Sequence, residues 1–85
     1  MATSYSDVAN EQLDEIAASG NIDLYNGLVT VCEWILDDPG LAQEQSSAIT
    51  TESGIVFRCA VPGFNPYKVF WTSAGPSVEA VFPHP

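Results

Sequence analysis

Apolar residues recur with two different periods along the chain, and the change falls near residue 54. Before that point they are spaced three or four residues apart, as on one face of a helix. After it they alternate with other residues, as in a strand with one buried face. The helical stripes are Val8, Leu13, Ile16 and Ala17 in one segment, and Leu24, Leu28, Val31, Cys32 and Ile35 in the next. The pattern predicts one α+β domain over residues 1–85, with helices before strands.

Capping and breaking residues set the limits of the two predicted helices, at about 6–19 and 22–37. Ser6 suits an N-cap position, and Ser19-Gly20 is a stop signal. Asp38 precedes a proline, which disfavours helical geometry there and ends the second helix. Because the loop between the helices is short, they should form an antiparallel hairpin. Residues 2–5 are predicted to be a short strand or a lead-in, and residues 41–53 a polar connection with a turn of helix at 41–45.

Three strands are predicted at about 55–61, 67–72 and 77–82. The segments between them, 62–66 and 73–76, have the composition of turns, so the strands should form an antiparallel meander. The expected register pairs Val61 with Tyr67 and Thr72 with Ser77. One face is then almost wholly apolar and should pack on the helix hairpin: Ile55, Phe57, Cys59, Val61, Tyr67, Val69, Trp71, Val78, Ala80 and Phe82.

The same register places the charged side chains of the strands on the outer face of the sheet. Arg58 and Lys68 become diagonal neighbours there, and Glu79 lies opposite Phe70. This predicted binding face consists of Val56, Phe70, Glu79 and Val81 around the two basic residues. It has two interpretations: a surface ion pair of Lys68 with Glu79 beside a packed Arg58 stem, or a site for an anion or phosphate.

Charge is distributed unevenly. The net charge is −9, ten of the 11 acidic residues lie before residue 54, and both basic residues lie after it. Such a field opposes nucleic-acid binding. The acidic half is either a solvated surface that keeps the protein soluble or a docking face for a basic partner.

Other features narrow the class of protein. Cys32 and Cys59 lie far apart without metal-binding spacing, which favours two buried thiols over a disulfide, and no metal or cofactor is expected. Residues 1–12 lack the basic and apolar regions of a secretory signal, and no apolar run approaches about 18 residues. We therefore expect a cytoplasmic protein without membrane contact. His84 lies between two prolines near the C-terminus and is predicted to be a solvated tail residue.

Four motifs resemble the RelE/ParE superfamily of bacterial toxin–antitoxin systems. They are Tyr5-Ser6-Asp7 with Ala9, Gln12-Leu13 and Ile16; Leu36-Asp37-Asp38-Pro39; Phe57-Arg58, Val61 and Gly63 with Tyr67-Lys68-Val69 and Trp71; and Val78, Val81 and His84. The resemblance covers nearly the whole chain. It implies a compact fold of a short strand, two helices and three antiparallel strands. It also implies a neutralising antitoxin partner.

The resemblance implies one of two activities. ParE-like members inhibit DNA gyrase, whereas RelE-like members are ribosome-dependent messenger-RNA endonucleases. In the second case Arg58 and Lys68 match the basic catalytic residues of the sheet, and His84 matches the C-terminal polar residue.

The acidic charge decides between these activities. RelE-like nucleases are strongly basic, so we expect a toxin component that acts by protein binding on an unknown target and is held by an antitoxin-like protein. One alternative is a metal-independent messenger-RNA endonuclease that uses Arg58, Lys68 and His84 and meets nucleic acid only on the ribosome. Another is a non-catalytic, acidic interaction or assembly module with a toxin-like fold. Self-association through an exposed sheet edge also stays open.

Overall fold

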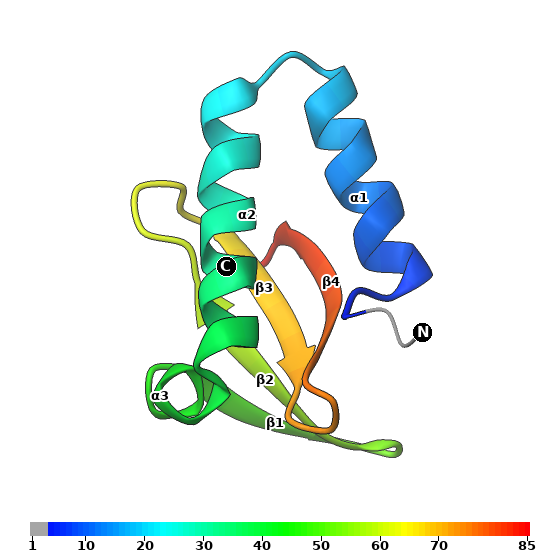
Figure 1. Cartoon of the computed structure of the whole chain (residues 1–85), viewed down its shortest axis with the longest axis vertical. Helices are drawn as coiled ribbons and strands as arrows, with labels where there is room; N and C mark the ends of the chain where they lie inside the picture. The colour runs from blue at the N-terminus through cyan, green and yellow to red at the C-terminus, as the bar shows by residue number, and fades with distance from the viewer. Residues whose placement is uncertain (1–3) are drawn as a thin grey trace.

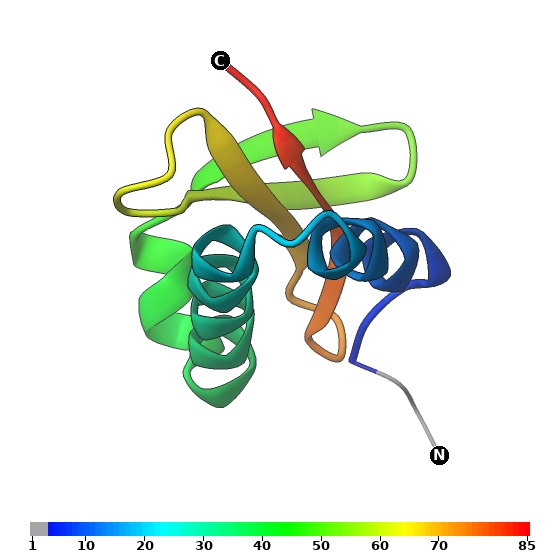
Figure 2. The ribbon, with the colours of Figure 1, turned by 90° about the horizontal axis from the view of Figure 1, so that it is seen from above.

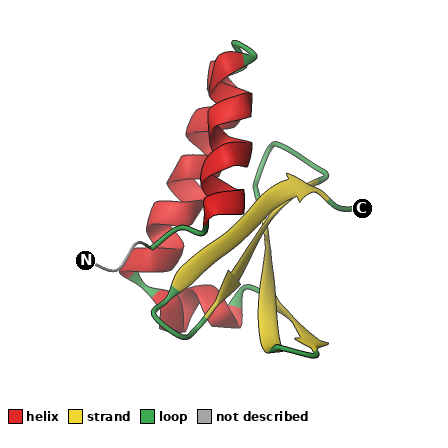
Figure 3. Cartoon of the chain, turned by 90° about the vertical axis from the view of Figure 1, so that its right-hand side faces the viewer, coloured by secondary structure: helices red, strands yellow, loops and turns green. Residues whose placement is uncertain are grey.

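A computed structural model describes residues 4–85, which form three helices and one sheet of four antiparallel strands. The helices are α1 (Asp7–Ala18), α2 (Ile22–Asp37) and α3 (Pro39–Glu44), and the strands are β1 (Ser47–Thr51), β2 (Gly54–Ala60), β3 (Tyr67–Thr72) and β4 (Ser77–Pro83). The helices lie on one face of the sheet and leave the other face uncovered (Figures 1 and 3). The predicted α+β class and the order of helices before strands are therefore confirmed.

Side-chain caps begin each helix, because the first N–H groups of a helix have no partner within it. Ser6 Oγ accepts from Ala9 N at 3.0 Å, and Asn21 Oδ1 accepts from the backbone of α2. Asp38 both ends α2 and begins α3, where its Oδ1 accepts from Leu41 N at 3.2 Å. The acidic end of α2 is thus the start of another helix, longer than the single turn predicted at 41–45.

Strand β1, which pairs with β2, lies in the segment that was predicted to be a polar connection. It pairs with β2 from Thr51↔Gly54 to Ser47↔Arg58, which makes the sheet one strand wider than expected. A tight turn at 52–53 joins the two strands, and Thr51 Oγ1 donates to Gly54 O at 2.8 Å. Gly54 has a φ of 126°, which favours glycine at this position. The β1–β2 hairpin extends past the helices, so Ile55, predicted to be in the core, is 55% exposed.

The β2–β3 hairpin follows the expected register, and the β3–β4 hairpin follows it from its turn as far as a bulge. Arg58 pairs with Phe70, and Thr72 pairs with Ser77, as predicted. Between Phe70 and Trp71 the register then shifts by one residue. A one-residue shift moves every later side chain to the opposite face of the sheet.

The bulge corrects three predicted positions on β4. Val81, predicted on the outer binding face, lies in the core and is 1% exposed. Ala80 and Phe82, predicted to face the helices, pair with Phe70 and Lys68 and share their outer face. Six members of the predicted set of apolar positions nevertheless belong to the core: Phe57, Cys59, Val61, Val69, Trp71 and Val78.

The core is made of buried side chains from the helices and from the sheet, and the helices and the sheet face one another in Figure 2. Trp71 is fully buried, and its Nε1 donates to Ser46 Oγ at 3.1 Å. Cys32 and Cys59 are buried free thiols, so the prediction of two reduced cysteines is confirmed. The predicted N-terminal segment falls partly outside the described residues. Within them, Tyr5 makes one isolated parallel bridge to Val78, as a lead-in would. No helix among residues 4–85 has the length and apolarity to cross a membrane.

Candidate functional site

The three predicted catalytic residues come together on the outer face of the sheet. Arg58 Nη1 lies 3.1 Å from His84 Nδ1. Lys68 Nζ and the backbone N–H of His84 both donate to the carbonyl of Pro66, at 3.2 and 2.9 Å. His84 is half-buried and held at two points, so the prediction of a solvated tail is wrong for this residue.

An aromatic cluster flanks these polar contacts. The rings of Phe70 and Phe82 stack with centroids 4.6 Å apart, and the His84 ring meets Phe70 edge-on at 5.4 Å. Stacked and edge-on geometries are favourable for aromatic pairs. Phe82 joins the cluster because of the bulge, which is why the sequence pattern did not place it there.

The predicted ion pair between Lys68 and Glu79 does not form. The Glu79 carboxylate instead accepts from Ser77 Oγ at 2.6 Å, and no salt bridge occurs within residues 4–85. Val56 pairs with Ile49 of β1 and is half-buried. Of the predicted binding face, Val56 and Phe70 therefore lie beside Arg58 and Lys68, whereas Val81 does not.

The contact between Arg58 and His84 determines which ring nitrogen of a neutral His84 carries the proton. A guanidinium is always a donor, so the Nδ1 of His84 accepts from it, and a neutral His84 ring then carries its proton on Nε2. Because the two basic side chains have no acidic partner within the described chain, they keep donors free for an anion. In the same residues, no three His, Cys, Asp or Glu side chains gather as metal ligands.

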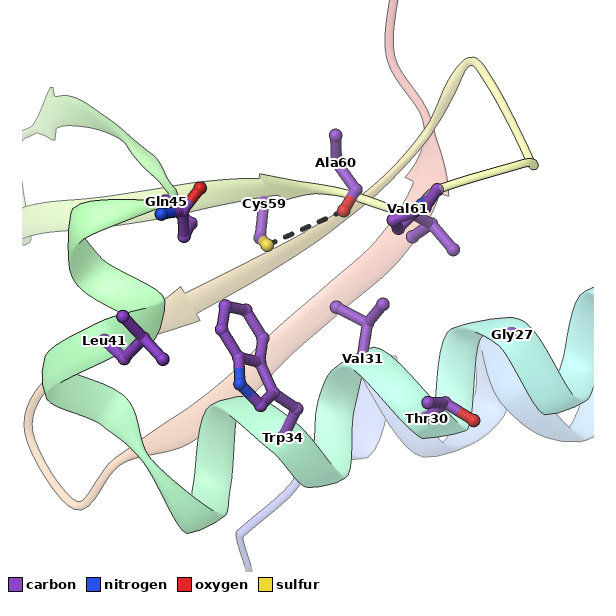
Figure 4. A pocket seen from close by; sticks show the side chains of 10 residues that line it. Gly27, Thr30, Val31, Trp34, Leu41, Gln45, Cys59, Ala60 and Val61 are labelled. Carbon is purple, nitrogen blue, oxygen red and sulfur yellow. Dashed lines mark hydrogen bonds between the residues drawn. The ribbon is translucent and has the colours of Figure 1, made fainter.

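A second feature is an open apolar pocket of about 700 Å³ between α2, α3 and the end of β2 (Figure 4). Trp34 and Val31 reach into it from α2, and Leu41 reaches into it from α3. Leu41 is 43% exposed, and Trp34 is half-buried. The pocket is lined by Gly27, Thr30, Val31, Trp34, Leu41, Gln45, Cys59, Ala60, Val61 and Pro62.

Local sequence explains the walls of this pocket. Gly27 lets the ring of Phe64 pack directly on α2, since a Cβ at Gly27 would lie 2.6 Å from Phe64 Cε2. Asp38 caps α3 and so brings Leu41 opposite α2. Burial raises the pKa of the Cys59 thiol, and a hydrogen bond with the Ser46 side chain lowers it by a smaller amount. The thiol, which lines the pocket, is therefore uncharged at neutral pH.

The sequence pattern did not predict this pocket. Trp34 was visible only as an extra apolar residue beside the buried stripe of the second helix, and Leu41 stood alone in a polar segment. The pocket depends on where α3 lies, which no periodicity determines. Comparisons with protein-family models, curated proteins and solved structures found no match for this chain. The resemblance to RelE/ParE toxins therefore stays a prediction.

Proposed function

We propose that this protein acts by binding another protein in the pocket between α2, α3 and β2. The observation that carries the proposal is the exposed apolar lining. Leu41 and Trp34 hold apolar surface at the mouth of a pocket of about 700 Å³, whose lining also includes core residues of α2 and β2. Exposed apolar surface that is hollowed and rimmed by polar residues is typical of interaction sites.

This proposal agrees with the expectation of a toxin component held by an antitoxin-like protein. It agrees equally with an acidic interaction module that has a toxin-like fold. Expression in bacterial cells separates these two: growth arrest that a co-expressed partner relieves supports a toxin, and absence of arrest supports the module.

A displayed library of random peptides tests the proposal, with binding to purified variants as the readout. Leu41→Gln removes apolar surface from the pocket. Ile55→Gln is the matched control, because Ile55 is also an exposed large apolar residue but lies at the β1–β2 hairpin, outside the pocket. Neither change touches the core, so both variants should keep their stability.

We expect selected peptides to bind the wild type and Ile55→Gln alike and to bind Leu41→Gln at least about tenfold more weakly, as for the central anchor of an interface. Equal binding to all three proteins, or no enrichment of any peptide, would contradict binding in the pocket.

A second candidate function, messenger-RNA cleavage, is favoured by the contact of Arg58 with His84 and the nearby Lys68. Cleavage of a phosphodiester needs a base, an acid and cations for the developing charge. Primer extension on messenger RNA after induction detects such cleavage directly. If expression arrests growth, and the arrest survives the combined change Lys68→Ala and His84→Ala, the nuclease function is excluded.

A further inference from the structure

The edge of the sheet formed by β4 is closed by hydrogen bonds from α1 and the segment before it. Ser6 N donates to Val78 O at 2.9 Å, and Ser6 Oγ donates to Glu79 O at 2.6 Å. Gln12 Oε1 accepts from Val81 N at 2.7 Å. A free strand edge is a template for pairing with another chain, and this edge is blocked.

The opposite edge of the sheet is open: β1 is an edge strand, and it does not cover the end of β2. Strand β1 pairs with β2 only as far as Ser47↔Arg58. Val61 N donates to Tyr67 O, so Val61 directs its backbone groups toward β3. Backbone groups alternate in direction along a strand, so the N–H and C=O of Ala60 point away from β3, beyond the end of β1.

The free edge at Ala60 is short but accessible. Ala60 is exposed, and its carbonyl accepts only a weak bond of 3.6 Å from the Cys59 thiol. Pro62 follows and has no N–H to extend a ladder. An added strand would therefore make one close pair of backbone bonds here, and most of its affinity would have to come from side chains.

The apolar pocket supplies the side-chain contacts at this edge. Ala60 lines the pocket, and Val31, Trp34 and Leu41 lie on its helix side (Figure 4). Side chains of a strand alternate between the two faces. A strand added at Ala60 would direct every second side chain toward the helices and into the pocket, and the others into solvent.

Three acidic residues lie one helical turn from residues that line this pocket. Asp37 follows the pocket residue Trp34 by one helical turn, and Glu44 follows Leu41 by one turn; Asp23 precedes Gly27 by one turn. All three carboxylates belong to exposed residues, and the chain has no basic residue before Arg58. A basic ligand gains attraction and correct orientation here, whereas an acidic ligand is repelled.

From these observations we propose that the pocket binds an extended segment of a partner protein in which apolar residues alternate with Lys or Arg, and that this segment adds as a short strand to the free edge at Ala60. The inference rests on the proposed function. It adds the conformation of the ligand, its charge, and the backbone group that pairs with it.

Amide spectra of the ¹⁵N-labelled protein test strand addition with blocked synthetic peptides. The probe is a hexapeptide of alternating lysine and valine, and the control has glutamate in place of lysine. Two further lysine peptides carry N-methyl groups on alternate residues, each blocking one edge of the peptide. We expect the lysine peptide to shift the Ala60 amide and slow its hydrogen exchange. One N-methylated peptide should bind as well as the lysine peptide and the other more weakly, and the glutamate peptide should not bind.

Paired charge variants test the electrostatic step. Asp37→Asn with Glu44→Gln removes two carboxylates beside the pocket, and Glu11→Gln with Asp14→Asn removes two from α1, away from it. The net charge changes equally in both. Only the first pair should weaken binding of the lysine peptide, and by about threefold or more at low salt.

The outcomes separate the inference from the proposed function. If library peptides require Leu41 but both N-methylated peptides bind equally, or the glutamate peptide binds as well as the lysine peptide, the pocket binds protein in another way and strand addition is overturned. Shifts confined to β1 would place the added strand on that strand's outer edge and also overturn it. If no peptide binds in a way that depends on Leu41, both the strand-addition inference and the proposed function are overturned.

Discussion

Ser6 joins α1 to the edge of β4 through both hydrogen-bonding functions of its hydroxyl group. The oxygen accepts from Ala9 N at 3.0 Å, and the hydroxyl donates to Glu79 O at 2.6 Å. Ser6→Ala removes the N-cap of α1 and leaves the part-buried carbonyl of Glu79 without this donor. Asn21→Ala is the matched control, because Asn21 Oδ1 only caps its own helix, by accepting from Leu24 N at 3.2 Å.

The two changes should differ in magnitude. Loss of an N-cap costs ~1 kcal/mol, and a part-buried acceptor left without its donor costs a further ~1–2 kcal/mol. The free energy of unfolding should therefore fall by about 2–3 kcal/mol for Ser6→Ala and by about 1 kcal/mol for Asn21→Ala. In a domain of this size each kcal/mol lowers Tm by roughly 4–8 °C.

Urea denaturation followed by the fluorescence of the two tryptophans, the buried Trp71 and the half-buried Trp34, measures both variants, and thermal melts provide an independent check. Ser6→Thr keeps the cap and the donor and should retain most of the stability. If Ser6→Ala costs no more than Asn21→Ala, the bond from Ser6 Oγ to Glu79 O contributes nothing to stability, and the hydroxyl does not help to close the β4 edge.

Three further predictions concern other parts of the chain. Burial, with the charge of Glu33 as the next cause, raises the pKa of Cys32 to about 12. The unfolded thiol loses its proton near the ordinary value of 9.0 while the folded one keeps it, so stability is complete below pH 9 and falls as the pH rises toward 12. Urea titrations should give a slope of up to ~1.4 kcal/mol per pH unit from this thiol, and Cys32→Ala should flatten it. Gly27→Ala should displace the ring of Phe64, and in a Phe64→Ala background it should stabilise the protein by ~1 kcal/mol through helix propensity, as a double-mutant cycle would measure. Neutral His84 should carry its proton on Nε2, which ¹⁵N shifts of the ring report; a proton on Nδ1 would contradict the contact with Arg58.

The elements with a buried apolar face could be predicted from the sequence, and those without one could not. The stripe of α2 and the alternation of β2 and β3 each have a core-facing period. Strand β1 has only one half-buried apolar residue, Ile49, because its hairpin extends past the helices. A strand exposed on both faces has no alternation to recognise. Helix α3 is six residues long and buries only Ala42, so its period was equally invisible.

The candidate site could be predicted as far as the β4 bulge. Arg58 and Lys68 were placed on one face because the β2–β3 register has no irregularity. In β4, the sequence does not show whether the strand keeps one register or shifts it at Glu79. Only three-dimensional packing decides which residues after Glu79 face the core. The structure buries Val81 and turns Ala80 and Phe82 outward, where the ring of Phe82 stacks on that of Phe70.

The bulge also connects the two sides of the sheet. Glu79 lies where the register shifts, and its carbonyl is held by Ser6 at the start of α1. Beyond it, Phe82 stacks on Phe70, and His84 reaches Arg58, so the cluster on the outer face depends on a contact made at the helix side. The pocket has a different origin, because it lies where α3 ends and β1 begins. The outer cluster should therefore respond to changes at Ser6, whereas peptide binding at Ala60 should not. A change in both would mean that the two sites share one conformational equilibrium.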